Sequence, residues 1–266
     1  MNRQKFLRTL SFGLTIALVS VAPSLAGVHY KSTSTTETGK RPMVMTVEAW
    51  AEGDQARVEF RESDNPILGK GTYLLSKDGG ETMILVDPEE KRFGRFSLEA
   101  LLGGVGAVFG GDNPLLKMEV SSPKVEKLLE EDGGQIAGYS TKHFRYRTSY
   151  RMNLKVFGIS RPADVVSEED LWVADSLTER GLGVWLRSRQ VKTGNADLDG
   201  LIEAEAKKYK GFPLKTVITT TSTSKGKPTT TTTRMEVTTI EKFTTSPVSF
   251  DVPAGYSAEE MMPQMP

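Results

Sequence analysis

The side chains that most often carry chemistry are scarce in this chain of 266 residues. There is no cysteine, which excludes thiol catalysis, disulfides, iron–sulfur clusters and thiolate zinc sites. There are two histidines, His29 and His143, and no Gly-x-Ser-x-Gly elbow that would present an activated serine. No nucleophile is recognisable beside His143. We therefore expect a protein that is not an enzyme, with no catalytic residue and no cofactor.

One acidic segment nearly matches a calcium-binding loop. Asn195, Asp197 and Asp199 hold the first, third and fifth positions of such a loop. Its twelfth position, which needs a bidentate glutamate, is Ala206. The same residues suit the start of a helix over 196–210, where a capping side chain and acids complement the helix dipole. We favour the helix start and expect no metal site.

Four basic side chains alternate along one side of the segment His143–Val156: Arg145, Arg147, Arg151 and Lys155. Such a stripe could bind an anionic head group or a phosphate. More often it is a solvated sheet face that pairs across strands with acids, here such as Glu48, Glu59 or Glu119. We favour the solvated face. Nucleic acid is not an expected partner, because 34 basic residues balance 34 acidic ones.

The other side of His143–Val156 is apolar, and the strict alternation predicts a strand of about 45 Å. Strands of that length are typical of strongly curved sheets or barrels. Further strands are predicted over 43–50, 55–62, 71–77, 81–87, 91–97, 116–120 with 125–129, 214–223, 229–243 and 248–252. Turns are predicted at Asp78–Gly80 and Asp132–Gly134. Residues 166–175 could begin a helix or continue a strand.

Residues 98–109 (LEALLGGVGAVF) are apolar on nearly every side but are interrupted by three glycines. They could form a helix over the sheet or a mobile loop. In either form they could act as a lid over an apolar groove. The predicted lid residues are Leu98, Leu101, Leu102, Val105, Val108 and Phe109.

The first 26 residues are typical of a secretory signal peptide. Arg3, Lys5 and Arg8 precede the apolar run Phe12–Ala22, which is too short to span a bilayer, and Ser24-Leu25-Ala26 suits a cleavage site. Cleavage removes three basic residues and no acidic one, so the net charge changes from zero to −3. We expect a periplasmic or secreted protein, not lipidated because no cysteine follows the leader. Residues 27–266 would form one domain with a short tail over 257–266.

The order of several segments resembles a known group of exported proteins. These segments are MILVDPEEKRF (83–93), DGGQIAGYSTKHFRY (132–146), DLWVADSL (170–177), GFPLKTV (211–217) and SFDVPAGY (249–256). Over roughly residues 28–256 the succession resembles bacterial domains of unknown function allied to the LolA/LppX-like lipoprotein carriers. The resemblance implies a mainly β, α+β fold. In that fold a strongly curved antiparallel sheet forms an incomplete barrel, and a few helices cover its concave face.

The resemblance also implies a function, namely binding an acyl chain, a lipid or a lipoprotein in an apolar groove. The predicted groove residues are Val58, Phe60, Tyr73, Leu75, Met83, Leu85, Phe144, Tyr146, Tyr150 and Met152. The same residues could simply be core. An alternative function is a structural or interaction protein whose exposed strands, notably the Thr-rich pair over 214–243, bind an envelope partner. Partners would then be lipid, acylated protein or an envelope protein, with peripheral membrane contact but no membrane span.

Overall fold

The computed structural model describes residues 27–39, 41–65, 68–97, 116–157, 159–186 and 196–259. Within these ranges it contains twelve strands and three short helical segments. The strands are β1 (Gly27–Glu37), β2 (Met43–Glu52), β3 (Gln55–Ser63), β4 (Tyr73–Ser76), β5 (Thr82–Asp87), β6 (Arg92–Ser97), β7 (Leu116–Ile136), β8 (Tyr139–Val156), β9 (Ile159–Ala174), β10 (Phe212–Ser224), β11 (Lys227–Phe243) and β12 (Ser257–Ala258). The helical segments are η1 (Arg180–Leu182), α2 (Gly183–Leu186) and α3 (Ala196–Ala206).

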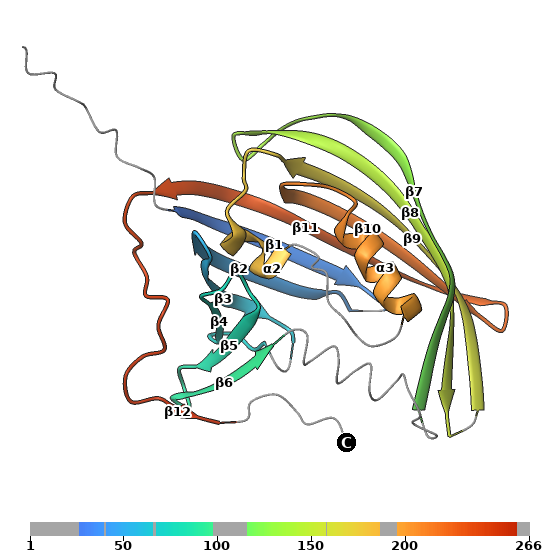
Figure 1. Ribbon diagram of the computed structural model, residues 1–266, viewed down its shortest axis with the longest axis horizontal. Coiled ribbons are helices and arrows are strands. Elements are labelled where there is room, and N and C mark those ends of the chain that lie inside the picture. The colour runs from blue at the N-terminus through green and yellow to red at the C-terminus, as the bar shows by residue number, and fades with distance from the viewer. Residues whose placement is uncertain are drawn as a thin grey trace, which may run out of the picture.

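All twelve strands belong to one open, strongly curved sheet in the order β12-β6-β5-β4-β3-β2-β1-β11-β10-β9-β8-β7. Every neighbouring pair is antiparallel except β12 and β6. Figure 1 shows the long strands β7–β11 arching over α2 and α3, which lie on the concave side of the sheet. The predicted fold class, a curved antiparallel sheet that forms an incomplete barrel with helices over its concave face, is confirmed.

Three tight turns connect the long strands, and they begin at Ala137, Phe157 and Lys225. Their first residues have φ of 48°, 48° and 50°, the left-handed conformation that tight hairpins with the sheet's twist require. The predicted turn at Asp132–Gly134 is wrong, because β7 continues through it. The register shifts between Asp132 and Gly134, so these residues form a bulge inside the strand.

Other boundaries also differ from the prediction. Residues 248–252 form no strand, and the last strand is instead β12, in which Ser257 and Ala258 pair with β6. The undecided segment 166–175 lies in strand β9 up to Ala174, and the predicted helix over 196–210 ends as α3 at Ala206. The predicted lid over 98–109 and the predicted leader over 1–26 lie outside the described residues.

The apolar residues divide between the two faces of the sheet. The largest cluster lies on the concave face of β1–β5, β10 and β11, where Leu182 and Val184 of the short helices pack on it. A second cluster joins β8 to β9 through Phe144 and Leu171. A third lies on the opposite face, where Val252 and Tyr256 of the C-terminal segment pack against β4–β6. The concave face is therefore the side on which a site between sheet and helices can form.

Candidate functional site

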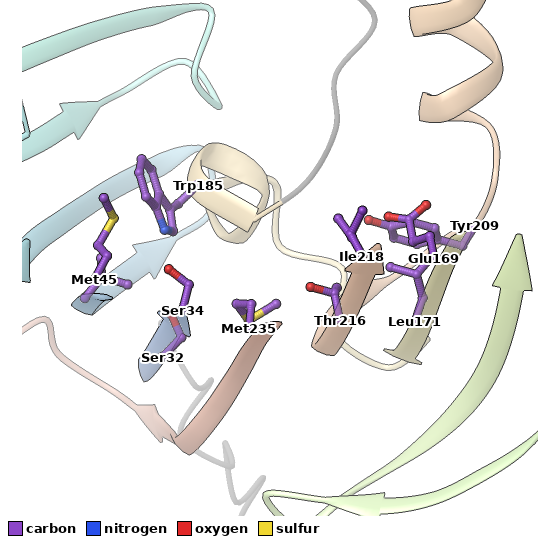
Figure 2. Close-up of a pocket in the computed structure, with 11 residues that line it drawn as sticks. Ser32, Ser34, Met45, Glu169, Leu171, Trp185, Tyr209, Thr216, Ile218 and Met235 are labelled. Atoms are coloured by element: carbon purple, nitrogen blue, oxygen red, sulfur yellow. The ribbon is translucent and has the colours of Figure 1, made fainter. Parts of the chain in front are cut away.

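A row of side chains crosses five adjacent strands on the concave face. Cross-strand pairing places Met45 opposite Ser34, Ser34 opposite Met235, and Met235 opposite Thr216, which in turn lies opposite Leu171. Residues that lie opposite each other in an antiparallel pair share a face of the sheet, so the row forms one surface. A hollow of about 250 Å³ opens above this row. Figure 2 shows Trp185 of α2 at one side of the hollow and Tyr209 at the other.

Two other hollows border this one and share lining residues with it. A hollow of about 200 Å³ shares Glu169 and Ile218 with it and extends to Tyr150 on β8. A hollow of about 220 Å³ shares Ser34 and Met45 with it and extends toward the ends of β1 and β2. Each hollow alone is smaller than a usual ligand pocket of about 300–1,000 Å³. The three hollows are neighbours along the concave face, and we call the row that they form the concave groove.

The floor of the concave groove contains a buried ionic cluster. Lys208 Nζ lies 2.6 Å from Glu169 Oε2 and 2.6 Å from Glu205 Oε2. Thr148 Oγ1 donates a hydrogen bond of 2.7 Å to Glu205 Oε1, and the Tyr146 hydroxyl donates one to the Lys208 carbonyl. The cluster ties β8 and β9 to the turn that follows α3. Fully ionised, it carries one positive and two negative charges.

Burial shifts the pKa values of the groups in this region. Desolvation raises the pKa of Glu169 above its ordinary value of 4.5, while the charge and the hydrogen bond of Lys208 act in the opposite direction. Desolvation also raises the pKa values of the Tyr146 and Tyr150 hydroxyls. Burial is therefore the largest influence on the pKa values of all three groups.

The structure distributes the ten predicted groove residues over both faces. Val58, Phe60, Met83 and Leu85 belong to the concave cluster, where Phe60 packs edge-on against Trp185. Tyr73 and Leu75 do not share that face, because they belong to the cluster beneath the C-terminal segment, and their neighbour Leu74 points into the concave side instead. We leave Tyr73 and Leu75 out of the groove.

The four predicted groove residues of β8 lie on its concave side, and they differ in their surroundings. Phe144 and Tyr146 are buried in the cluster against which Tyr209 packs. Tyr150 lines the concave groove, and Met152 follows it on the same side of the strand. Tyr150 is the one predicted residue in the walls of the hollows described above.

Most groove-lining residues were missed by the sequence reasoning. They comprise Ser32, Ser34, Met45, Val47, Glu169, Leu171, Trp185, Tyr209, Thr216, Ile218 and Met235. The small polar residues of β1 and β10 carry no apolar alternation, and Glu169 stands in an acidic run typical of a solvated surface. The apolar run Leu171-Trp172-Val173 could have indicated a buried strand that contributes to the groove. The prediction left 166–175 open between a helix and a strand, so no groove residue was taken from it.

The convex face of β8 carries the basic stripe, and each of its members is paired. Arg145 contacts Asp170, Arg147 contacts Glu168, Arg151 contacts Asp164, and Lys155 contacts Glu119. The favoured solvated face is confirmed, with acids that come mostly from β9. Of the acids proposed as partners, Glu119 pairs with the stripe, whereas Glu48 and Glu59 lie on β2 and β3 and bind Arg61.

His143 lies on this convex face between two carboxylates. Its Nδ1 is 3.0 Å from Glu131 Oε1 and its Nε2 is 2.7 Å from Asp170 Oδ1. Its ring stacks on Trp172 with 4.3 Å between centroids. Across the described ranges, no group of three or more histidine and acidic side chains is arranged to hold a metal ion.

No helix in the described part of the chain is long and apolar enough to cross a membrane.

Comparison with solved structures finds several similar folds, including the following two. A LolA superfamily protein from Nitrosomonas europaea is 12% identical, with a TM-score of 0.29 over 84% of this chain and 88% of that one. A DUF1329 family protein from Desulfovibrio piger is 11% identical, with a TM-score of 0.30 over 82% of this chain and 86% of that one. No curated protein matches the sequence.

The family comparison covers the groove itself. The family model "Domain of unknown function (DUF4412)" matches residues 38–256. This range contains β2–β11, so it includes every strand of the groove except β1. The chain belongs to the DUF4412 family.

Proposed function

We propose that this protein is a non-enzymatic carrier that holds the acyl chain of a lipid or of an acylated protein in the concave groove. The observation that carries the proposal is that the three hollows are neighbours on one face, with Ser34 and Met45 lining two of them at one end and Glu169 and Ile218 lining two at the other. An apolar chain needs a long, dry slot more than it needs specific polar partners, because its binding free energy comes from buried area, about 25 cal/mol per Å².

The dimensions of the groove support this ligand class. From Met45 on β2 to Tyr150 on β8 the groove crosses six adjacent strands. At about 4.8 Å between strands this is roughly 24 Å. One acyl chain spans about half of the 30 Å hydrocarbon core of a bilayer, or roughly 15 Å. The groove is therefore long enough for one chain, with its apolar wall supplied by Met45, Trp185 and Ile218 among others.

The ionic cluster supports a ligand whose head group stays outside the floor. Lys208 already contacts two carboxylates, and the cluster has an excess of one negative charge when ionised. A free carboxylate or phosphate placed beside it would be repelled. The groove therefore suits an esterified or amide-linked acyl chain better than a free fatty acid buried head first.

The proposal includes an exported location. Residues 1–26 would direct the chain to the periplasm and be removed, leaving residues 27–266 as one soluble domain. An exported protein without cysteine carries no attached lipid, so any lipid in the groove would be a cargo. An envelope role, such as outer-membrane maintenance, follows from this location and ligand.

The test is to measure bound and exchangeable lipid. The mature protein, purified from a bacterial periplasm, is extracted with organic solvent and the extract is analysed by mass spectrometry. Uptake of a fluorescent phospholipid is then compared for Ile218→Trp, which fills the wall common to two hollows, and Val217→Trp, which changes the adjacent residue on the opposite face. We expect extracted lipid, and uptake lost in the first variant alone. If the unmodified protein contains no lipid and takes up no fluorescent phospholipid, the carrier function is refuted.

The alternative function, binding of an envelope protein by strand addition, needs a free edge of the sheet. Both strands of the Thr-rich hairpin are paired on both sides, so this hairpin offers no edge. The free edge at this end of the sheet is β7, 21 residues long, which has charged residues and a bulge at Pro123 that discourage pairing. A photo-crosslinker at Leu128, compared with one at the buried Leu74, tests this function. A specific adduct from Leu128 supports it, and equal labelling contradicts it.

A further inference from the structure

The turn between β8 and β9 presents two large apolar side chains to solvent. Phe157 is 73% exposed and Ile159 is 62% exposed, the two highest values among the large hydrophobic residues of the described chain. They are separated by one residue at the tip of the hairpin. Single exposed apolar residues are common, but two on one tight turn form a protruding apolar point.

The backbone at this turn makes Phe157 an unusual choice. Its φ is 48°, in the left-handed region that asparagine and glycine adopt most readily and that costs energy for a bulky side chain. The equivalent positions in the other two long hairpins hold Ala137 and Lys225. Turn geometry alone therefore does not account for an aromatic ring at position 157.

The surroundings of the turn are basic. Arg161 is exposed on β9, and Lys225 and Lys227 are exposed on the neighbouring β10–β11 turn. These three side chains form no ion pair with any described residue. Ser224 Oγ donates a hydrogen bond of 3.0 Å to the Pro162 carbonyl, which joins the two turns side by side. At this end of the sheet, at the lower right of Figure 1, cations therefore flank the apolar point.

We propose that this end of the sheet docks on a bilayer surface that contains anionic lipid. Phe157 and Ile159 enter the interfacial layer, and Arg161, Lys225 and Lys227 contact the lipid head groups. Apolar side chains with flanking cations are the combination that holds peripheral proteins on anionic membranes. In addition, and resting on the proposed function, Met152 and Leu154 continue the concave side of β8 from Tyr150 toward the turn, which gives a lipid an apolar path into the groove.

The experiment is flotation of the full mature protein with vesicles of phosphatidylcholine alone or mixed with phosphatidylglycerol. The test variant is Phe157→Asn with Ile159→Thr, which removes the apolar point while giving the turn its preferred Asn-Gly sequence, so the hairpin is retained. The matched control is Leu128→Asn, an exposed apolar residue about 40 Å away along the strands. We expect binding to the mixed vesicles to fall at least tenfold in the test variant and to be unchanged in the control.

A second variant tests the charges. Arg161→Glu with Lys225→Glu is expected to weaken binding to the mixed vesicles at least tenfold while leaving the weaker binding to phosphatidylcholine unchanged. Added salt should reduce binding of the unmodified protein in the same way. No binding to either vesicle, or equal binding by the test variant and the unmodified protein, overturns the proposal. The proposal is also overturned if a photo-crosslinker at position 157 captures a protein while the unmodified protein binds no vesicles. Uptake of fluorescent phospholipid from detergent should persist in the test variant. The result for membrane docking can therefore be distinguished from the result for lipid binding in the concave groove.

Discussion

Lys208 Nζ lies 2.6 Å from a carboxylate oxygen of Glu169, and the Lys208 side chain is only 4% exposed. The contact joins strand β9 to the turn after α3 and forms part of the floor of the concave groove. An ion pair in such a place costs desolvation energy that its attraction only partly returns. The pair therefore places charged groups in a wall that also contains apolar residues such as Leu201 and Ile218 and hydroxyl groups such as Thr148 and Thr220.

Replacing Lys208 by methionine should strongly destabilise the protein. The change leaves the carboxylates of Glu169 and Glu205 close together without their cation, and breaking a buried pair in this way costs about 3–5 kcal/mol. The matched control is Lys207→Met, because Lys207 is 64% exposed and pairs with Glu203 on the surface of α3. That change should cost at most about 1 kcal/mol. Urea denaturation of both variants measures the difference, and equal losses would show that the Lys208 pair is not buried in solution.

The pH dependence of stability should carry a contribution from Glu169. Because burial raises its pKa above the ordinary value of 4.5, the folded protein holds the proton more tightly than the unfolded chain does. The contribution of Glu169 to stability is therefore fully present below pH 4.5 and is lost as the pH rises through the raised pKa. Glu169→Gln removes this contribution, so the difference in free energy of unfolding between variant and unmodified protein should change as the pH rises from 4.5 through the raised pKa. Glu168→Gln, on the opposite and exposed face, is the control, and parallel pH profiles for Glu169→Gln and the unmodified protein would contradict the assignment.

The strands could be predicted because alternation is a local property. His143–Val156 lies within one strand of the curved sheet, and the apolar side predicted for Phe144 and Tyr150 is the concave side. The turns could be located less well, because Asp132-Gly133-Gly134 has turn composition but the tertiary pairing with β8 absorbs it as a bulge. The turn between β7 and β8 is instead Ala137-Gly138, which carries one glycine and a first residue with a φ of 48°, whereas the turn expected between 223 and 229 is confirmed at Lys225-Gly226.

The existence of a groove was predicted from the sequence, but of the ten residues predicted to line it only Tyr150 lines the hollows. A hollow forms where small side chains leave space unfilled. Whether the space is filled depends on side chains that are distant in the sequence and lie on neighbouring strands. Ser34 and Thr216 line the groove because they are small and stand between Met45, Met235 and Leu171, a neighbourhood that cross-strand register alone creates. Tyr73 was assigned to the groove because β4 is apolar on both faces, which leaves no alternation to tell the faces apart.

Tyr30 offers a substitution that should not weaken the protein. Its side chain is buried against Phe212, its hydroxyl has no hydrogen-bond partner among the described residues, and burial raises its pKa. Tyr30→Phe removes an unsatisfied polar atom and should leave the free energy of unfolding unchanged or raise it by about 1 kcal/mol. Tyr146→Phe is the comparison, because the Tyr146 hydroxyl donates to the Lys208 carbonyl and its loss should cost about 1 kcal/mol. A clear loss of stability in Tyr30→Phe would mean that its hydroxyl has a partner in solution.

Two glycines should respond in opposite directions to alanine. A Cβ added at Gly181 of η1 would lie 2.2 Å from the Gln55 carbonyl oxygen and 3.1 Å from the Ala51 side chain, so η1 would have to move off the β2–β3 hairpin. We expect Gly181→Ala to lower the free energy of unfolding by about 1–3 kcal/mol. A Cβ added at Gly200 of α3 meets no atom within 4 Å, and alanine favours the helix by about 1 kcal/mol over glycine. Thermal unfolding of the two variants should therefore give melting temperatures on opposite sides of that of the unmodified protein. A Gly181→Ala variant as stable as the unmodified protein would contradict the close packing of η1 on the hairpin.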